Sequence, residues 1–323
     1  MAESGLSLGY SDIAALVARS ALGYSSTSTA WTTEQTNDVN HAIKKGYSDF
    51  LSAHEWSFLR KFARITTTAG YSTGTIALTA DDATVTLTTG TWPAWAAQGS
   101  LYYDSTEYEI ASRTSDTEIE LAAVWAGSTA TGESYSIRRI AYDLPDDYGQ
   151  PLSFFTYDTQ HSRDPIQRIN VNDLMALRSG SDTASIPRYA ATRPKTSDFD
   201  NSTGQRYEVL FYPLADGVYT LGYTYAVLAE NTLSSTNPYP LGGQPHAQTI
   251  LDCCISAARY LYRDMSQAEY RADIANSMQA SIERDGAQNG EFQGYNMDRS
   301  DSRNRPWTDL NHSVTVNGVM PGY

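Results

Sequence analysis

One five-residue segment has the spacing of a catalytic serine motif. Gly70-Tyr71-Ser72-Thr73-Gly74 fits the pattern G-x-S-x-G, in which a serine on a sharp strand-to-helix turn acts as a nucleophile. Here the segment lies between two strand-like stretches, 65–68 and 76–79, and no helical pattern follows it. We therefore predict that the two glycines serve a hairpin turn and that Ser72 is not catalytic.

The acidic residues and histidines do not converge on a reactive group either. His54-Glu55 lacks the second histidine, four residues on, that a zinc-protease helix requires. The acidic pairs Asp81-Asp82 and Asp146-Asp147 lie at predicted turns, where carboxylates commonly cap backbone N–H groups. Three isolated histidines are expected on the polar surface: His161, His246 and His312. Without a phosphate loop, a dinucleotide fingerprint or Cys/His metal spacing, we predict no catalytic residue, no cofactor and no metal site, hence no enzyme.

The two cysteines, Cys253 and Cys254, are adjacent on a predicted helix. Neighbouring side chains on a helix point about 100° apart, and a disulfide between them is strained. The absence of a disulfide framework predicts synthesis in a reducing compartment. The first ten residues lack the basic and apolar regions of a signal peptide, and no stretch approaches the roughly 20 apolar residues that cross a bilayer. We expect no membrane partner.

Composition indicates a globular protein with extensive contact surfaces. The chain has 323 residues, of which 41% are hydrophobic and 19% charged, and it contains 23 tyrosines. Tyrosine combines a large contact area with a polar tip, so it suits interfaces as well as cores. The net charge of −14 argues against a nucleic acid held through its phosphates, because such binding depends on lysine and arginine. An acidic wall would instead repel passing DNA.

The predicted fold class is α+β, with a helical bundle built from both ends of the chain. Residues 1–61 are predicted helical: Ser11 or Asp12 caps a first helix, Gly23 ends it, and Thr32 with Gln35 forms a capping box for a second. Residues 237–290 form a helical hairpin with an apolar stripe on each helix.

Between the helical parts the apolar period changes to two. Residues 62–145 contain short alternating segments separated by turn signals, which predict an inserted small antiparallel β-barrel or sandwich. Trp92, Trp95 and Trp125 are expected to plug its ends. Residues 146–236 are a mixed region with a short helix capped by Asn170 and a β-hairpin at 206–228, turned by Asp216-Gly217.

The last segment, 291–323, has neither period and is predicted to be an extended C-terminal arm. Free tails are poor in aromatic residues because they cannot bury them, whereas this one alternates aromatic residues with arginines. Trp, Tyr and Arg are enriched at interface hot spots. The predicted partner-binding residues are Phe292, Tyr295, Arg299, Arg303, Arg305, Trp307 and Tyr323.

Taken in order, these parts resemble the head-to-tail adaptor (connector) proteins of tailed bacteriophages. The resemblance is carried by the run from Tyr10 to Arg19, the segment from His54 to Arg60, the β block, the segment Tyr142–Asp147 and the C-terminal helix pair ending at Asp285. It covers most of the chain as an arrangement, without a diagnostic motif. The β block and the region 206–228 exceed the small all-helical connectors, so the larger tail-tubular-like adaptors are the nearer match.

The resemblance implies a structural protein of the virion neck, made in the host cytoplasm. Such proteins form a ring, usually of twelve copies, beneath the portal protein; the ring extends the DNA channel without binding DNA specifically and offers a platform for the next neck or tail protein. The arm 291–323 would then contact the portal. Another neck or minor tail protein is the first alternative. A carbohydrate-binding or depolymerising tail protein is the second, and it predicts paired carboxylates in an aromatic cleft.

Overall fold

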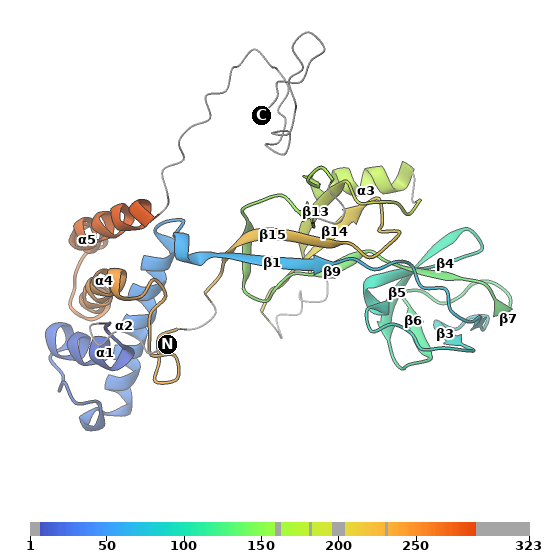
Figure 1. The fold of residues 1–323 in the computed structure, drawn as a ribbon. Coiled ribbons are helices and arrows are strands. Elements are labelled where there is room, and N and C mark those ends of the chain that lie inside the picture. Colours follow the sequence, from blue (N-terminus) through green and yellow to red (C-terminus); the bar gives the residue numbers. More distant parts are fainter. Residues whose placement is uncertain (1–6, 159–162, 181–182, 196–203, 230–231, 289–323) are drawn as a thin grey trace, which may run out of the picture.

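The computed structural model describes residues 7–158, 163–180, 183–195, 204–229 and 232–288. Most of the helices gather at one end of an elongated molecule, a strand-rich unit with one helix lies in the middle, and a second group of strands forms the other end (Figure 1). The predicted α+β class is confirmed: the described residues form five α-helices together with predominantly antiparallel, curled sheets.

The helical end combines segments from both ends of the chain. It contains α1 (Tyr10–Val17), α2 (Thr33–Ser52), α4 (Gln244–Tyr262) and α5 (Gln267–Gln288). The predicted capping box of α2 is confirmed, because Gln35 N–H donates to Thr32 Oγ1 at 3.2 Å and Thr32 N–H donates to Gln35 Oε1 at 3.0 Å. The cap predicted for α1 is wrong. Gly9 is the N-cap, and Asp12 instead accepts from Gly9 N–H at 3.1 Å, since its carboxylate reaches back one turn.

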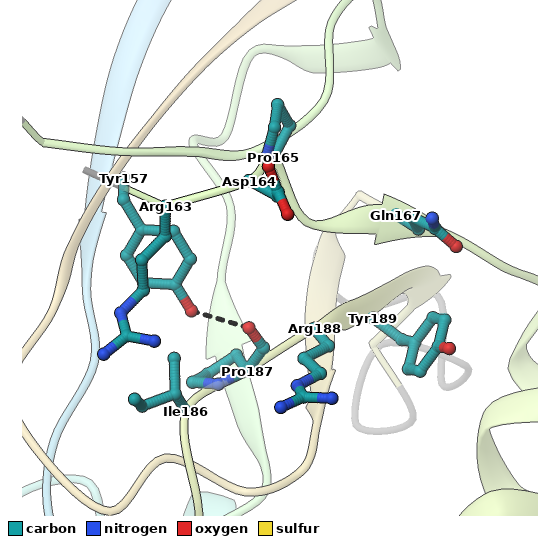
Figure 2. Close-up of a pocket in the computed structure, with 9 residues that line it drawn as sticks. All are labelled: Tyr157, Arg163, Asp164, Pro165, Gln167, Ile186, Pro187, Arg188 and Tyr189. Atoms are coloured by element: carbon teal, nitrogen blue, oxygen red, sulfur yellow. Dashed lines mark hydrogen bonds between the residues drawn. The ribbon is translucent and has the colours of Figure 1, made fainter. Parts of the chain in front are cut away.

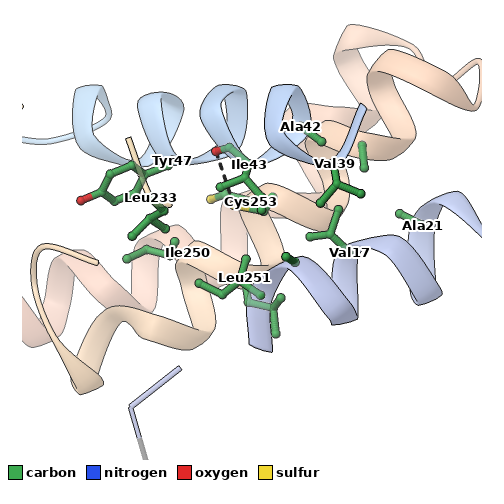
Figure 3. Packing of buried hydrophobic residues seen from close by; sticks show 14 of the residues in the cluster. Val17, Ala21, Val39, Ala42, Ile43, Tyr47, Leu233, Ile250, Leu251 and Cys253 are labelled. Atoms are coloured by element: carbon green, nitrogen blue, oxygen red, sulfur yellow. Dashed lines mark hydrogen bonds between the residues drawn. The ribbon is translucent and has the colours of Figure 1, made fainter. Parts of the chain in front are cut away.

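One hydrophobic core joins these helices (Figure 3). α2 and α4 approach closely at Gly46, where a Cβ atom would lie 2.5 Å from the Cα of Cys254. The Cys254 thiol lies against the backbone oxygen of Ile43 at 3.7 Å. Both cysteines are fully buried and unpaired, and burial raises the pKa of the Cys253 thiol to about 12. They therefore act as small packing residues, as expected for a buried cysteine.

The far end is a seven-stranded antiparallel sheet with the order β7-β2-β3-β6-β5-β4-β8. Alternating apolar residues of its strands point into a core of their own, with Trp92 fully buried and Trp95 and Trp125 half-buried against it. The short strand β7 was not predicted, because its residues do not alternate between apolar and polar. The strands are β2 (Ile76–Leu78), β3 (Thr84–Leu87), β4 (Gly99–Tyr103), β5 (Thr106–Arg113), β6 (Glu118–Leu121), β7 (Ala130–Glu133) and β8 (Ser136–Arg139).

The middle unit consists of two four-stranded sheets that share a hydrophobic core. In the first sheet, β15 (Thr220–Val227) lies between β1 (Arg60–Thr66) on one side and β10 (Tyr148–Pro151) and β11 (Thr156–Tyr157) on the other. The second sheet has the order β12 (Gln167–Arg168), β13 (Tyr189–Pro194), β14 (Tyr207–Tyr212) and β9 (Ala141–Asp143). Helix α3 (Val171–Gly180) packs on the second sheet through Leu174, and Asn170 caps it as predicted, accepting from Asn172 N–H at 2.7 Å.

The β-hairpin predicted at 206–228 is wrong. Its two strands are β14 and β15, and they pair with strands of different sheets rather than with each other. The reason is that β14 is buried on both faces: Val209 and Phe211 face the core between the sheets, while Leu210 packs with Leu174 of α3. A strand covered on both sides belongs inside a layered unit, so the connection at 213–219 crosses between layers.

The limits predicted for the β insert, 62–145, also need correction. β1 pairs along its whole length with β15, and β9 pairs with β14, so residues 60–66 and 141–143 belong to the middle unit. Period-two alternation identified these residues as strands. It carries no information about which sheet each strand joins.

Candidate functional site

The predicted partner-binding residues lie outside the described part of the chain. This holds for Phe292, Tyr295, Arg299, Arg303, Arg305, Trp307 and Tyr323. What the structure provides is the place from which that segment departs, because the described chain ends at Gln288 on α5. The surroundings of this helix end are therefore the first candidate region.

The last turn of α5 is fastened to the chain that follows α2. Asp285 is fully buried, and its carboxylate accepts from the backbone N–H of Ser57 at 3.0 and 3.2 Å and from the Ser57 hydroxyl at 2.5 Å. His54 Nε2 lies 3.8 Å from the same carboxylate. Hydrogen bonds to an ionised acceptor are stronger than neutral ones. Asp285 thus holds the end of α5 at the junction between the helical end and the middle unit.

An aromatic cluster packs beneath this fastening. Trp56 stacks on Phe50 at 4.5 Å between ring centroids, and the ring of His246 lies 5.3 Å from both Trp56 and Phe58. Trp56 donates from Nε1 to the backbone oxygen of Phe50 at 2.9 Å. The surface position expected for His246 is wrong, because only 1% of it is exposed. Burial lowers the pKa of His246, so the ring is neutral at neutral pH.

A groove of about 590 Å³ lies beside the same junction. We call it the junction groove. Its rim carries His54, Glu55, Arg60 and Gln150, and Leu228 on its wall is 56% exposed. It is bounded by the end of α2, the start of β1, the β10 segment and the end of β15, and its apolar lining residues include Leu51, Trp56, Leu59, Leu152, Val227 and Leu228.

A second cleft, of about 540 Å³, lies in the middle unit (Figure 2). Arg163 and Arg188 line it together with Tyr157 and Tyr189, and the Tyr157 hydroxyl donates to the backbone oxygen of Pro187 at 2.6 Å. Burial raises the pKa of Tyr157, so its hydroxyl stays protonated and can hold this bond. Asp164 is the one carboxylate among the described lining residues, so they provide no acid/base pair.

Sequence reasoning missed this cleft because its walls come from separate stretches of the chain, 163–167 and 186–189, together with Tyr157. Both stretches carry an arginine within two residues of a proline, in Arg163-Asp164-Pro165 and in Pro187-Arg188. This shared pattern is the sequence feature that could have indicated the cleft, and it is not specific.

The serine motif does not form a nucleophile elbow. Tyr71 forms an isolated bridge to Ile137, with hydrogen bonds of 2.8 and 2.7 Å, and strand β2 follows instead of a helix. Gly74 has φ +80°, and a Cβ there would lie 2.0 Å from the backbone oxygen of Thr89. The glycine therefore has a backbone role, as predicted. The expected hairpin turn is absent, because the segment connects β1 and β2, which belong to different sheets.

The acidic pairs serve structure, in two different ways. Asp82 accepts from the backbone N–H and the hydroxyl of Thr84, both at 3.1 Å, and these bonds lower its pKa. Asp147 accepts from Lys61 at 2.9 Å and from the Tyr225 hydroxyl at 2.7 Å. Burial alone would raise the pKa of Asp147, but these hydrogen bonds lower it overall. Asp82 caps a turn as predicted, whereas Asp147 links β1 to β15.

Across the described segments, no three His, Cys, Asp or Glu side chains gather in a group that could hold a metal ion. In the same part of the chain, no helix has the length and apolar character needed to cross a membrane. No protein-family model matches the sequence, and a search of curated proteins finds no similar chain.

Proposed function

We propose that the protein is a structural component of a phage neck, a head-to-tail adaptor that assembles as a ring beneath the portal protein. The observation that carries this proposal is the fastening of α5 by Asp285 to Ser57. It fixes the point from which the aromatic and arginine-rich segment 291–323 leaves the helical end. A segment with interface-type composition, attached at a rigid point, suits docking onto another protein.

In this proposal the helices from both chain ends form the bundle that builds the ring. The β insert acts as a small barrel or sandwich that projects from it, and the middle unit joins the two. Each subunit of a closed ring needs two different contact faces, and the abundant tyrosines suit such surfaces. The net charge of −14 supports a channel along which DNA slides without binding. Twelve copies, a portal contact on one side and a neck or tail protein on the other complete the arrangement.

The test is removal of residues 291–323. The full chain and the truncated chain are each mixed with candidate portal rings and examined by electron microscopy and sedimentation. We expect the truncated protein to fold, as measured by circular dichroism, and to lose portal binding. Portal binding equal to that of the full chain would contradict the proposed role of the segment.

The cleft of Figure 2 favours a second candidate, a carbohydrate-binding protein of the tail. Two tyrosines, two arginines and Gln167 offer aromatic surface and hydrogen-bond donors of the kind that hold an acidic sugar. Its single described carboxylate fits binding better than hydrolysis, which requires a pair. Titration of the protein with glucuronic acid and with glucose tests this candidate. We expect glucuronic acid to bind and glucose, which lacks a carboxylate, not to bind. Arg188→Ala should abolish the binding of glucuronic acid.

A further inference from the structure

The junction groove is an apolar site beside the end of the described chain. Its wall residue Leu228 is 56% exposed, although Leu228 N–H is held by the backbone oxygen of Asp147 at 2.8 Å. An exposed leucine on a fixed backbone, next to further apolar lining residues, is the kind of surface that another chain segment covers. The groove lies between two units, a common place for binding sites.

The end of α5 lies at the rim of this groove. Asp285 is 3.8 Å from His54, and His54 lines the groove. The helix continues for three residues beyond Asp285, to Gln288. From there a chain extends by at most about 3.5 Å per residue, so Phe292 can lie no more than about 14 Å beyond the helix end.

The residues that follow match the groove in chemistry. Phe292 is the first large apolar residue after Ile282, and Glu291 directly precedes it. The groove offers apolar walls for a phenyl ring, and its rim carries Arg60, which can pair with a carboxylate, alongside the acidic Glu55. Burial of a phenylalanine side chain in such a groove is favourable, because it removes a large apolar surface from water.

We infer that residues 291–295 of the same chain dock in the junction groove, with Phe292 as the apolar anchor. The segment then acts as a strap between the helical end and the middle unit, and the partner-binding part of the C-terminal arm begins after Tyr295. This inference does not depend on the identity of the partner, because it concerns a contact within one chain.

The first experiment is limited digestion with chymotrypsin. Intact-mass spectrometry measures how fast the chain is cleaved after Phe292. Leu228→Glu places a charge in the groove and leaves the chain otherwise intact. Val218→Glu is the matched control, since Val218 is 64% exposed and does not line the groove. We expect cleavage after Phe292 to become roughly tenfold faster or more in Leu228→Glu and to stay unchanged in Val218→Glu. Equal cleavage in all three proteins would overturn the inference.

The second experiment distinguishes two possible occupants of the groove, Phe292 of the same chain and a second copy of the protein. The double variant Leu228→Cys/Phe292→Cys is oxidised and compared with Val124→Cys/Phe292→Cys, in which the first cysteine lies in the distant β insert. The native cysteines are buried and do not compete. A disulfide within one chain, formed only in the first variant, is expected. A disulfide that forms only between two chains would show that a second copy of the protein occupies the groove. Absence of any disulfide would show that Phe292 does not reach Leu228. Either outcome contradicts the inference.

Discussion

Asp285, on the last turn of α5, accepts hydrogen bonds from both the backbone N–H and the hydroxyl of Ser57, 228 residues earlier in the chain. The contact closes the helical end, because it ties the last described helix to the connection between α2 and β1. It also fixes where the C-terminal segment begins.

Replacing Asp285 by alanine should therefore destabilise the fold. The backbone N–H of Ser57 would lose its acceptor at a part-buried site, and an unsatisfied buried donor costs about 1–3 kcal/mol. Urea unfolding followed by circular dichroism measures the change. Glu283→Ala, at an exposed position on the same helix, is the control and should shift the free energy of unfolding by no more than about 0.5 kcal/mol. Equal losses in the two variants would contradict the structural role of Asp285.

His246 should make stability dependent on pH. Its pKa in the folded protein is lowered from 6.5, chiefly by burial, with Arg284 lowering it further and Asp285 raising it. Because the unfolded chain binds the proton more readily, the contribution of neutral His246 is present above about pH 6.5 and is lost as the pH falls through the folded pKa.

This pH dependence can be assigned by substitution. The loss of stability between pH 7.5 and pH 5 should be smaller in His246→Gln than in the parent protein. The exposed His41, changed to glutamine, should leave the difference unaltered. Urea unfolding at both pH values measures it, and an unchanged pH dependence in His246→Gln would assign the effect to other groups.

Gly46 and Gly286 should respond in opposite ways to a methyl group. At Gly46 a Cβ would lie 2.5 Å from the Cα of Cys254 and 2.6 Å from the backbone oxygen of Cys253, so α2 and α4 would have to separate. At Gly286, also within a helix, no atom lies within 4 Å of that position. We expect Gly46→Ala to lower the free energy of unfolding by about 1–3 kcal/mol and Gly286→Ala to raise it by about 0.5–1 kcal/mol. Thermal unfolding of the two variants checks both signs.

If the proposed function holds, the residues after Tyr295 should carry the contact with the portal protein. Trp307→Ala and the double change Arg303→Ala/Arg305→Ala remove side chains of the types that dominate interface energetics. Each should weaken binding to the portal by about tenfold or more without changing thermal stability. Lys44→Ala, on an exposed face of α2, serves as a control for the removal of a charge. Binding that is unaffected by both arm variants would move the contact to another surface.

The sequence by itself determined the local elements of this protein. Thr32 and Gln35 mark the start of α2, Asn170 marks the start of α3, and alternating residues such as Ile76 and Leu78 mark strands, because capping and periodicity act over a few neighbouring residues. It also supplied the composition of the segment after α5.

Only the tertiary structure decided which elements meet. The sequence pattern of β14 and β15 predicts a hairpin, yet the two strands lie in two facing sheets. The reason is that α3 buries the second face of β14. Because α3 is distant from β14 in sequence, the local pattern does not reveal this contact. His246 reads as a surface residue, yet packing against Phe58 and Trp56 buries it. Asp285 and Ser57 are far apart in the chain, and sequence periodicity reports only on near neighbours. Contacts of this kind therefore depend on how the layers pack.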